Sequence, residues 1–230
     1  MNFKKRSLIF VTFFVSCFCI SLLGAALGTE HWVEAGCRRE GDFSEKSNGT
    51  VNFGLFQGSR HLNSGLGDRY YPMNMLQILY RERSFLQYEL YISTIALVSG
   101  GILFGIFASL LAIVNTAYNP IEAICHVPGL YLTNGLAMLS SLAAFITWMV
   151  QFYTKLTHNV LIREDREEGR WRSDGMAIYG YSFWLTVIAT VCYLINIGII
   201  SYATWDPVVK KKTKHFESLP AKQTGDTMLY

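Results

Sequence analysis

The stretch LIFVTFFVSCFCISLLGAALG, residues 8–28, decides the fold, because it runs for 21 residues without one charged side chain. A helix needs about 20 apolar residues to cross a hydrocarbon core of roughly 30 Å. Only helices and closed barrels satisfy every backbone polar group inside such a core. The stretch therefore predicts a transmembrane helix.

Three more blocks without charge follow, and the chain as a whole is 51% hydrophobic but only 16% charged. We expect the four spans to cover residues 8–28, 91–117, 128–154 and 179–204. The first block could instead be a cleaved signal peptide, but its apolar run exceeds the roughly 7–15 residues of such a segment. The sequence thus predicts an all-α membrane protein, a four-helix transmembrane bundle.

Basic residues near the span ends indicate the orientation. Lys4, Lys5 and Arg6 precede the first span, and four lysines follow the last one within residues 210–214. The loop 30–89 is charge-balanced, with seven basic and eight acidic residues, and the segment 155–175 carries five of each. We therefore expect cytoplasmic termini and a plasma-membrane protein delivered by the secretory pathway. The remaining expected segments are the N-terminus 1–7, extracellular loops 29–90 and 155–178, an inner turn 118–127, and a cytoplasmic tail 205–230.

The first outer loop contains VNFGLFQGSRHLNSGLG, residues 51–67, which is apolar and rich in glycine. Period-two alternation predicts short strands that pack a small core, with Phe53, Leu55 and Phe56 on the buried face. Glycines would permit bends and close backbone approach. The expected loop-fold motif consists of Trp32, Phe53, Gly54, Leu55, Phe56, Gly58, Gly65, Leu66 and Gly67. Asn48-Gly49-Thr50, just before it, is an acceptor for N-glycosylation.

Two other outer segments have helical patterns. Apolar residues at Met73, Leu76, Leu79 and Tyr80 predict an amphipathic helix after the strands, lying on the outer leaflet or against them. In the second outer loop, alternating charges favour a helical extension of the third span that ends at Gly169, or else a charged loop.

Small and polar residues inside the spans indicate helix packing. Gly24 and Gly28 are four residues apart, as are Gly101 and Gly105, which is typical of close helix approach within a bundle or at a dimer face. Asn134 and Asn196 lie within the third and fourth spans. Their amides would bond neighbouring helices, with a permeation or substrate site as the alternative.

The sequence offers little chemistry. The uncharged spans argue against proton relays and ion pathways. The five histidines are scattered, and we see no metal-ligand spacing, no phosphate loop and no nucleophile motif. We therefore expect no enzyme, no metal and no cofactor. The net charge of +3 reflects the juxtamembrane lysines, which would meet lipid headgroups or act only as topology signals, and needs no nucleic acid.

Single residues leave several options open. Cys37 would be an unpaired extracellular thiol or an intermolecular bridge. Cys125, in the inner turn, would be palmitoylated or remain an unmodified thiol. The C-terminal Met228, Leu229 and Tyr230 could add to the sheet edge of a PDZ domain, or belong to an unstructured tail.

Several motifs together resemble the clarin family, within the claudin and PMP22-like four-transmembrane superfamily. They cover nearly the whole chain: ALGTEHW at 26–32, FGLFQG at 53–58, SGLG at 64–67, NP at 119–120, VPGLYLTNGL at 127–136, YGYSFWL at 179–185 and MLY at 228–230. The resemblance implies a claudin-like extracellular loop. It also implies a disulfide across that loop in other members, but Ser64 stands here where they have a cysteine, which leaves Cys37 alone.

By this resemblance we expect a non-enzymatic accessory or scaffold protein, linked in the family to sensory-cell maintenance, membrane microdomains and actin. Its partners would be membrane lipids and other membrane or cytoskeleton-linked proteins, with a second copy of the chain as a further possibility. The alternatives are a claudin-like adhesion or barrier protein and a small-solute permeation protein.

Overall fold

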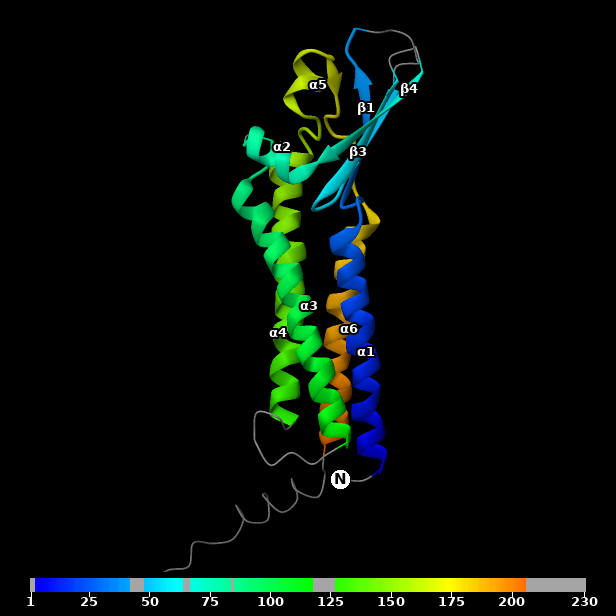
Figure 1. Ribbon diagram of the computed structural model, residues 1–230, viewed down its shortest axis with the longest axis vertical. Coiled ribbons are helices and arrows are strands. Elements are labelled where there is room, and N and C mark those ends of the chain that lie inside the picture. Colours follow the sequence, from blue (N-terminus) through cyan, green and yellow to red (C-terminus); the bar gives the residue numbers. More distant parts are fainter. Residues whose placement is uncertain (1–2, 42–47, 64–66, 84, 118–126, 206–230) are drawn as a thin grey trace, which may run out of the picture.

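The computed structural model describes residues 3–41, 48–63, 67–83, 85–117 and 127–205. Four long helices run side by side along it (Figure 1). They are α1 (Phe3–Gly28), α3 (Tyr88–Ala117), α4 (Val127–Gln151) and α6 (Tyr181–Thr204). α4 continues as the π-helix η1 (Phe152–Leu156). All four are long and apolar enough to cross a membrane, so the chain is an integral multi-pass membrane protein.

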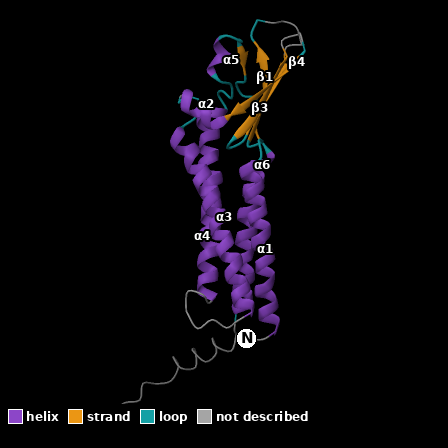
Figure 2. Cartoon of the chain, in the orientation of Figure 1, coloured by secondary structure: helices purple, strands orange, loops and turns teal. Residues whose placement is uncertain are grey.

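Between α1 and α3 the chain forms an antiparallel sheet that stands beyond one end of the bundle (Figure 2). Its strands are β1 (Val33–Arg39), β2 (Asn48–Phe53), β3 (Gln57–Asn63) and β4 (Asp68–Asn74). A short helix, α2 (Met75–Arg81), follows β4 and begins at Asn74, whose side chain accepts from the Gln77 N–H. The predicted fold class, a four-helix bundle with a small sheet in the first loop, is confirmed.

The segment between α4 and α6, the expected second outer loop, joins the same sheet, which the sequence did not predict. β5 (Trp171–Arg172) and β6 (Ala177–Tyr179) both pair with β1, so the order is β4-β3-β2-β1-β5 with β6 beside it on β1. The expected helical extension to Gly169 is wrong. The helix ends after Leu156, and only the short α5 (Arg163–Glu167) follows it.

A side-chain turn explains why the helix stops. The Asn159 amide donates to the Leu161 carbonyl at 2.7 Å, and the Leu161 N–H donates back to Asn159 Oδ1 at 3.0 Å. Asparagine favours such local bonds over helix. The turn also allows Val160 and Leu161 to become buried, which an exposed, charged helix would not permit.

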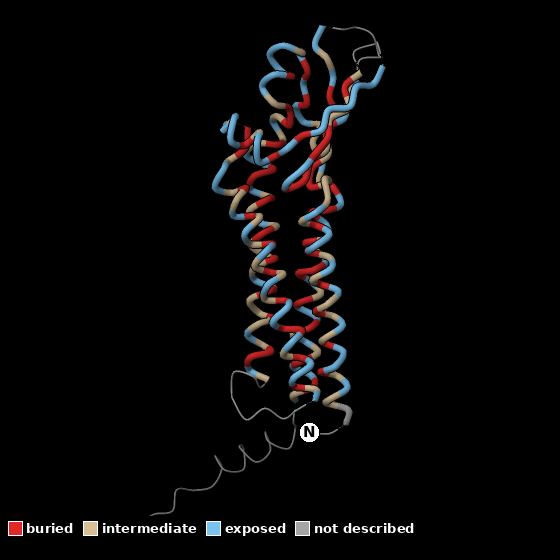
Figure 3. Tube along the Cα trace, in the orientation of Figure 1, coloured by how far each residue is buried: buried red, intermediate tan, exposed pale blue. Residues whose placement is uncertain are grey.

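One continuous apolar core joins the sheet to the bundle, as the buried residues in Figure 3 show. Alternate residues of a strand lie on opposite faces of a sheet. The face toward α5 buries a set of side chains from all four long strands: Val33, Ala35, Cys37, Val51, Phe53, Leu62 and Met73. The opposite face is more polar. The two faces therefore have different roles, the first in packing and the second in contact with the surroundings.

Candidate functional site

The turn between β2 and β3 is held by one side chain to the end of α3 that lies next to the sheet. The Tyr91 hydroxyl donates into this turn, 2.7 Å from the Leu55 carbonyl oxygen and 3.0 Å from that of Gly54. Tyr91 and Leu55 are both fully buried. The Gly54 N–H closes the turn with the Gln57 carbonyl at 2.8 Å. Because buried polar groups are costly to leave unpaired, this contact fixes the turn on the bundle.

Trp32 connects the bundle to the sheet at a second point. Its indole N–H donates to the Ala26 carbonyl at 2.6 Å, so the ring folds back over the end of α1. The ring lies edge-on to Trp148 of α4, with centroids 5.0 Å apart. Its main chain donates to Phe53 at 3.0 Å and accepts from Gly180 at 3.2 Å. Trp32 therefore ties α1, β2, α4 and the start of α6 together.

Two glycines of the expected loop-fold motif are needed for close backbone approach. A Cβ atom on Gly54 would overlap the Thr29 carbonyl oxygen, and one on Gly58 would overlap Phe53 on the neighbouring strand. Any larger residue at either position would push the turn away from α1 or separate β2 from β3. Gly67 has a φ of 108°, in the region that favours glycine. Gly65 and Leu66 lie outside the described residues.

Phe56 is a correction to the expected buried face. Phe53 and Leu55 are buried, but Phe56 is 37% exposed at the tip of the turn. The strand alternation predicted from the sequence ends at Phe53, since residues 54–56 form the turn and no longer alternate between faces. Phe56 instead contributes a main-chain contact, accepting from the Met75 N–H at 3.0 Å.

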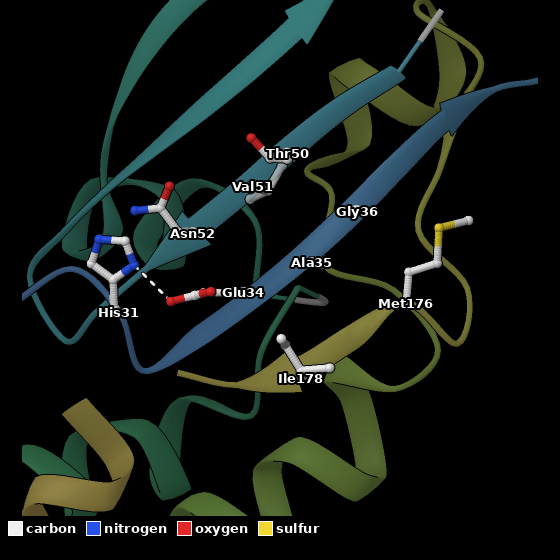
Figure 4. Close-up of a pocket in the computed structure, with 9 residues that line it drawn as sticks. All are labelled: His31, Glu34, Ala35, Gly36, Thr50, Val51, Asn52, Met176 and Ile178. Atoms are coloured by element: carbon white, nitrogen blue, oxygen red, sulfur yellow. Dashed lines mark hydrogen bonds and ion pairs between the residues drawn. The ribbon is translucent and has the colours of Figure 1, made fainter. Parts of the chain in front are cut away.

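The outward face of the sheet has a hollow of about 380 Å³ over β1 and β2 (Figure 4). Gly36 leaves its floor without a side chain, while Met176 and Ile178 of the second loop form one side. His31 Nδ1 lies 2.9 Å from Glu34 Oε1 at one end. The hollow thus presents an acidic group, an imidazole and an exposed aliphatic surface from both loops.

Asn48, the expected glycosylation site, lies on this same face. It is exposed at the first position of β2, opposite Arg38. Thr50 and Asn52, two and four residues along the strand, line the hollow. Since alternate strand residues share a face, a sugar on Asn48 would extend from the rim of the outward face.

On the inward face, an ion pair joins the two outer loops. Arg60 Nη1 of β3 bonds Asp165 Oδ2 of α5, with both side chains largely buried. The Arg60 guanidinium also lies 5.0 Å from the centre of the Tyr71 ring. Burial raises the pKa of Asp165, and the Arg60 charge opposes that shift.

Cys37 lies on this inward face and is only 2% exposed. Burial, together with the Asp165 charge, raises the pKa of its thiol to about 12. Of the two possibilities open in the sequence, this position favours a free thiol, because a bridge to another molecule would require the sheet to open.

The two intramembrane asparagines lie together in the bundle. Asn196 donates to Asn134 Oδ1 at 2.8 Å and to Ser16 Oγ at 3.0 Å, and Asn134 donates to the Leu130 carbonyl at 2.8 Å. The cluster links α1, α4 and α6, as expected for polar groups that connect helices.

The four glycines of the expected packing positions divide into two pairs. Gly101 and Gly105 of α3 are buried against other helices, and a Cβ on Gly105 would overlap the Tyr193 hydroxyl. Gly24 and Gly28 of α1 are exposed, with no other atom near an added Cβ. The expectation that this second pair packs inside the bundle is wrong, because the helix turns them toward its outer surface.

Some expected sites cannot be placed. Cys125, Ser64 and the tail residues Met228, Leu229 and Tyr230 lie outside the described residues. In the part of the chain that the structure describes, no group of three or more His, Cys, Asp or Glu side chains could hold a metal ion.

Sequence reasoning missed Tyr91, Trp148 and the Arg60–Asp165 pair. Tyr91 and Trp148 are aromatic residues near the outer ends of spans, where such residues are common as interfacial anchors. Nothing in a single sequence distinguishes an anchor that faces lipid from one that faces the core. The ion pair joins residues 105 positions apart and leaves no local signal.

Comparison with known proteins shows similarity along most of the chain. The chain is 26% identical to clarin-3 of Homo sapiens over 215 residues, a stretch that covers 88% of each protein. No family model matches the sequence. The match spans the helices and the sheet together, so it concerns the whole architecture and not a single helix.

Proposed function

We propose that this chain is a clarin-like, non-enzymatic accessory protein of the plasma membrane, on the basis of its similarity to clarin-3 over 88% of its length. Its extracellular sheet presents a surface on which partner membrane proteins dock. By the same family resemblance, those partners belong to actin-linked membrane maintenance of the kind found in sensory cells.

One observation carries the proposal: both outer loops form a single sheet that is fixed to the bundle. β5 and β6 of the second loop pair with β1 of the first, and Tyr91 and Trp32 hold the sheet to the helix ends. A surface ordered before binding loses little conformational entropy when a partner docks. The hollow beside Gly36 lies on the outward face of this sheet.

The orientation proposed for the chain puts the sheet outside the cell. Support comes from the basic residues at both termini, since cytoplasmic segments near spans are enriched in Lys and Arg. Enzymatic deglycosylation should increase the mobility of the protein on a gel, and Asn48→Gln should remove that shift. If neither enzymatic deglycosylation of the wild type nor the Asn48→Gln change altered the mobility, this orientation would be contradicted.

The docking surface can be tested by proximity labelling from the cell surface in cells that express the protein. Ile178→Arg places a large charged side chain at the edge of the hollow, where Ile178 is 59% exposed. Leu76→Arg is the matched control, because Leu76 is a similarly exposed aliphatic residue on α2, away from the hollow. We expect a set of membrane proteins to be labelled in cells that express the wild type or the Leu76→Arg control, but not in cells that express Ile178→Arg.

Surface expression of each variant is measured in the same cells, so that loss of labelling is separated from loss of protein. Equal labelling for all three forms would rule out the hollow as the docking surface. Recovery of no membrane or cytoskeletal protein with any form would contradict the accessory function itself.

One observation favours adhesion between cells as a second candidate. The outer edge of β4 pairs with no strand among the described residues, and Tyr70 on it is 59% exposed. Because Met75 bonds Phe56, ladder alternation turns the backbone of Tyr70 and Pro72 toward this edge. Pro72 has no N–H to donate, which limits pairing there. Adhesion predicts that cells expressing the protein cluster, and that Tyr70→Glu abolishes the clustering.

A further inference from the structure

Two neighbouring side chains at the outer end of α4 carry buried polar atoms without a partner. Trp148 and Gln151 are both fully buried. Among the described residues, Trp148 Nε1 and both Gln151 amide atoms, Nε2 and Oε1, have no hydrogen-bond partner in the protein. The residues are three positions apart, which puts them on one face of the helix. This concentration is unusual, because most buried polar groups in proteins are paired.

The polar groups of the two aromatic rings that pack against Trp148 are already in use. The Trp32 indole N–H, on the ring that packs against Trp148, donates to Ala26. Tyr91, whose ring centre is 6.1 Å from that of Trp148, donates its hydroxyl proton to the Leu55 turn. Neither of these two groups is therefore a partner for the Trp148 indole N–H or the Gln151 amide.

The helix also changes form at this point. The π-helix η1, Phe152–Leu156, begins directly after Gln151, and the Thr157 N–H bonds the Phe152 carbonyl five residues back at 3.0 Å. π-Helical turns are rare and occur frequently at functional sites. A wider helical turn and a group of unpaired polar atoms thus coincide at the junction of bundle and sheet.

We propose that Trp148 and Gln151 form a buried hydration site, occupied by ordered water at the outer mouth of the bundle. Water accepts from Trp148 Nε1 and from the Gln151 NH₂ group, and donates to Gln151 Oε1. Buried waters in proteins typically make about three such bonds to groups that would otherwise be unpaired. A neutral site suits these residues, since neither side chain carries a charge.

Hydroxyl-radical footprinting with a brief X-ray pulse, on the purified full-length protein, tests this site. The radicals form from water, so a bound water oxidises the side chains it touches even where bulk solvent is excluded. We expect Trp148 to be oxidised several-fold faster than Met75. Met75 is the internal control, because it is also fully buried and has a readily oxidised side chain.

Gln151→Met supplies the second measurement, because it keeps the length of the side chain and removes the amide. We expect Trp148 oxidation in this variant to fall to the level of Met75, with Met75 itself unchanged. Slow oxidation of Trp148 in the wild type would overturn the proposal, and this result does not depend on whether the variant folds. Equally fast oxidation in wild type and variant would also overturn it, since Gln151 would then hold no water.

Discussion

The hydroxyl of Tyr91, near the start of α3, donates to the carbonyl oxygen of Leu55, 2.7 Å away in the turn between β2 and β3. Both residues are fully buried, so no bulk solvent competes for the bond. The first outer loop is thereby attached to the bundle through its own backbone. In the absence of a loop disulfide between Cys37 and position 64, packing and this bond hold the sheet in place.

Tyr91→Phe should destabilise the protein by about 1–3 kcal/mol, because it leaves buried carbonyl oxygens without a donor. For a chain of this size each kcal/mol lowers the midpoint of thermal unfolding by roughly 2–4 °C. The measurement is thermal unfolding of the purified protein in detergent. Tyr88→Phe is the control, since Tyr88 is exposed one turn earlier and should give the wild-type midpoint. Equal midpoints for Tyr91→Phe and wild type would show that the bond does not stabilise the fold.

Removing one partner of the Arg60–Asp165 pair should reduce the stability of the protein more than Tyr91→Phe does. Arg60→Met leaves Asp165 buried without its counter-charge, and such changes cost about 3–5 kcal/mol. The double variant Arg60→Met with Asp165→Leu should recover most of this loss, because two apolar side chains require no charge pairing. Thermal unfolding of the three forms gives the comparison.

The exposed pair Arg163–Glu167 provides the control for this experiment. Arg163→Met should leave the midpoint of thermal unfolding close to the wild-type value, as is typical of surface ion pairs. If Arg60→Met were as mild as Arg163→Met, the pair between the loops would have no structural role.

The spans and the strands were predictable from the sequence for different reasons. Uncharged runs of this length predict membrane-spanning helices, and a long apolar helix lies over each of the four runs. The strands around Phe53 were visible through local alternation. β5 and β6 were not, because each is only two or three residues long and forms by pairing with β1, more than 130 positions away.

The second limit of sequence-based prediction was which face of each helix points into the bundle. The spacing of Gly24 and Gly28 is the same as that of Gly101 and Gly105, yet only the second pair lies between helices. Hydrophobicity cannot distinguish these faces, because lipid and bundle core are equally apolar. For the same reason the sequence did not show that Trp148 and Gln151, the two residues of the hydration site, face the interior of the protein.

The glycine pairs give a direct prediction. Gly105→Ala should destabilise the bundle by about 1–3 kcal/mol, because the new methyl group overlaps the Tyr193 hydroxyl. Gly24→Ala adds the same methyl group where no atom is near, and should be neutral or stabilising by up to about 1 kcal/mol through helix propensity. Thermal unfolding of both variants measures these two effects. A larger loss of stability for Gly24→Ala than for Gly105→Ala would contradict the position of Gly24 on the exposed side of α1.

Cys37 should be unreactive in the folded protein. With its pKa raised to about 12, only about one thiol in 10⁴ is ionised at pH 8, and the sulfur is buried. Maleimide labelling followed by mass spectrometry should therefore leave Cys37 unmodified until the protein is denatured. Tyr70→Cys, at an exposed position of β4, should be labelled at once. A Cys37-dependent dimer on non-reducing gels would contradict the buried position.

Asn196→Leu tests whether the polar cluster holds the bundle together. Asn196 connects Thr12 and Ser16 of α1 to Asn134 of α4, so the change removes three interhelical bonds and leaves Asn134 Oδ1 without a donor. Interhelical bonds in membranes contribute about 0.6 kcal/mol on average and at most about 1.7. We therefore expect a modest loss for Asn196→Leu and near-recovery when Asn134→Leu is added, because the second change removes the unpaired amide. Thermal unfolding of the single and double variants measures both effects. A double variant less stable than Asn196→Leu alone would mean that Asn134 has a role beyond pairing with Asn196.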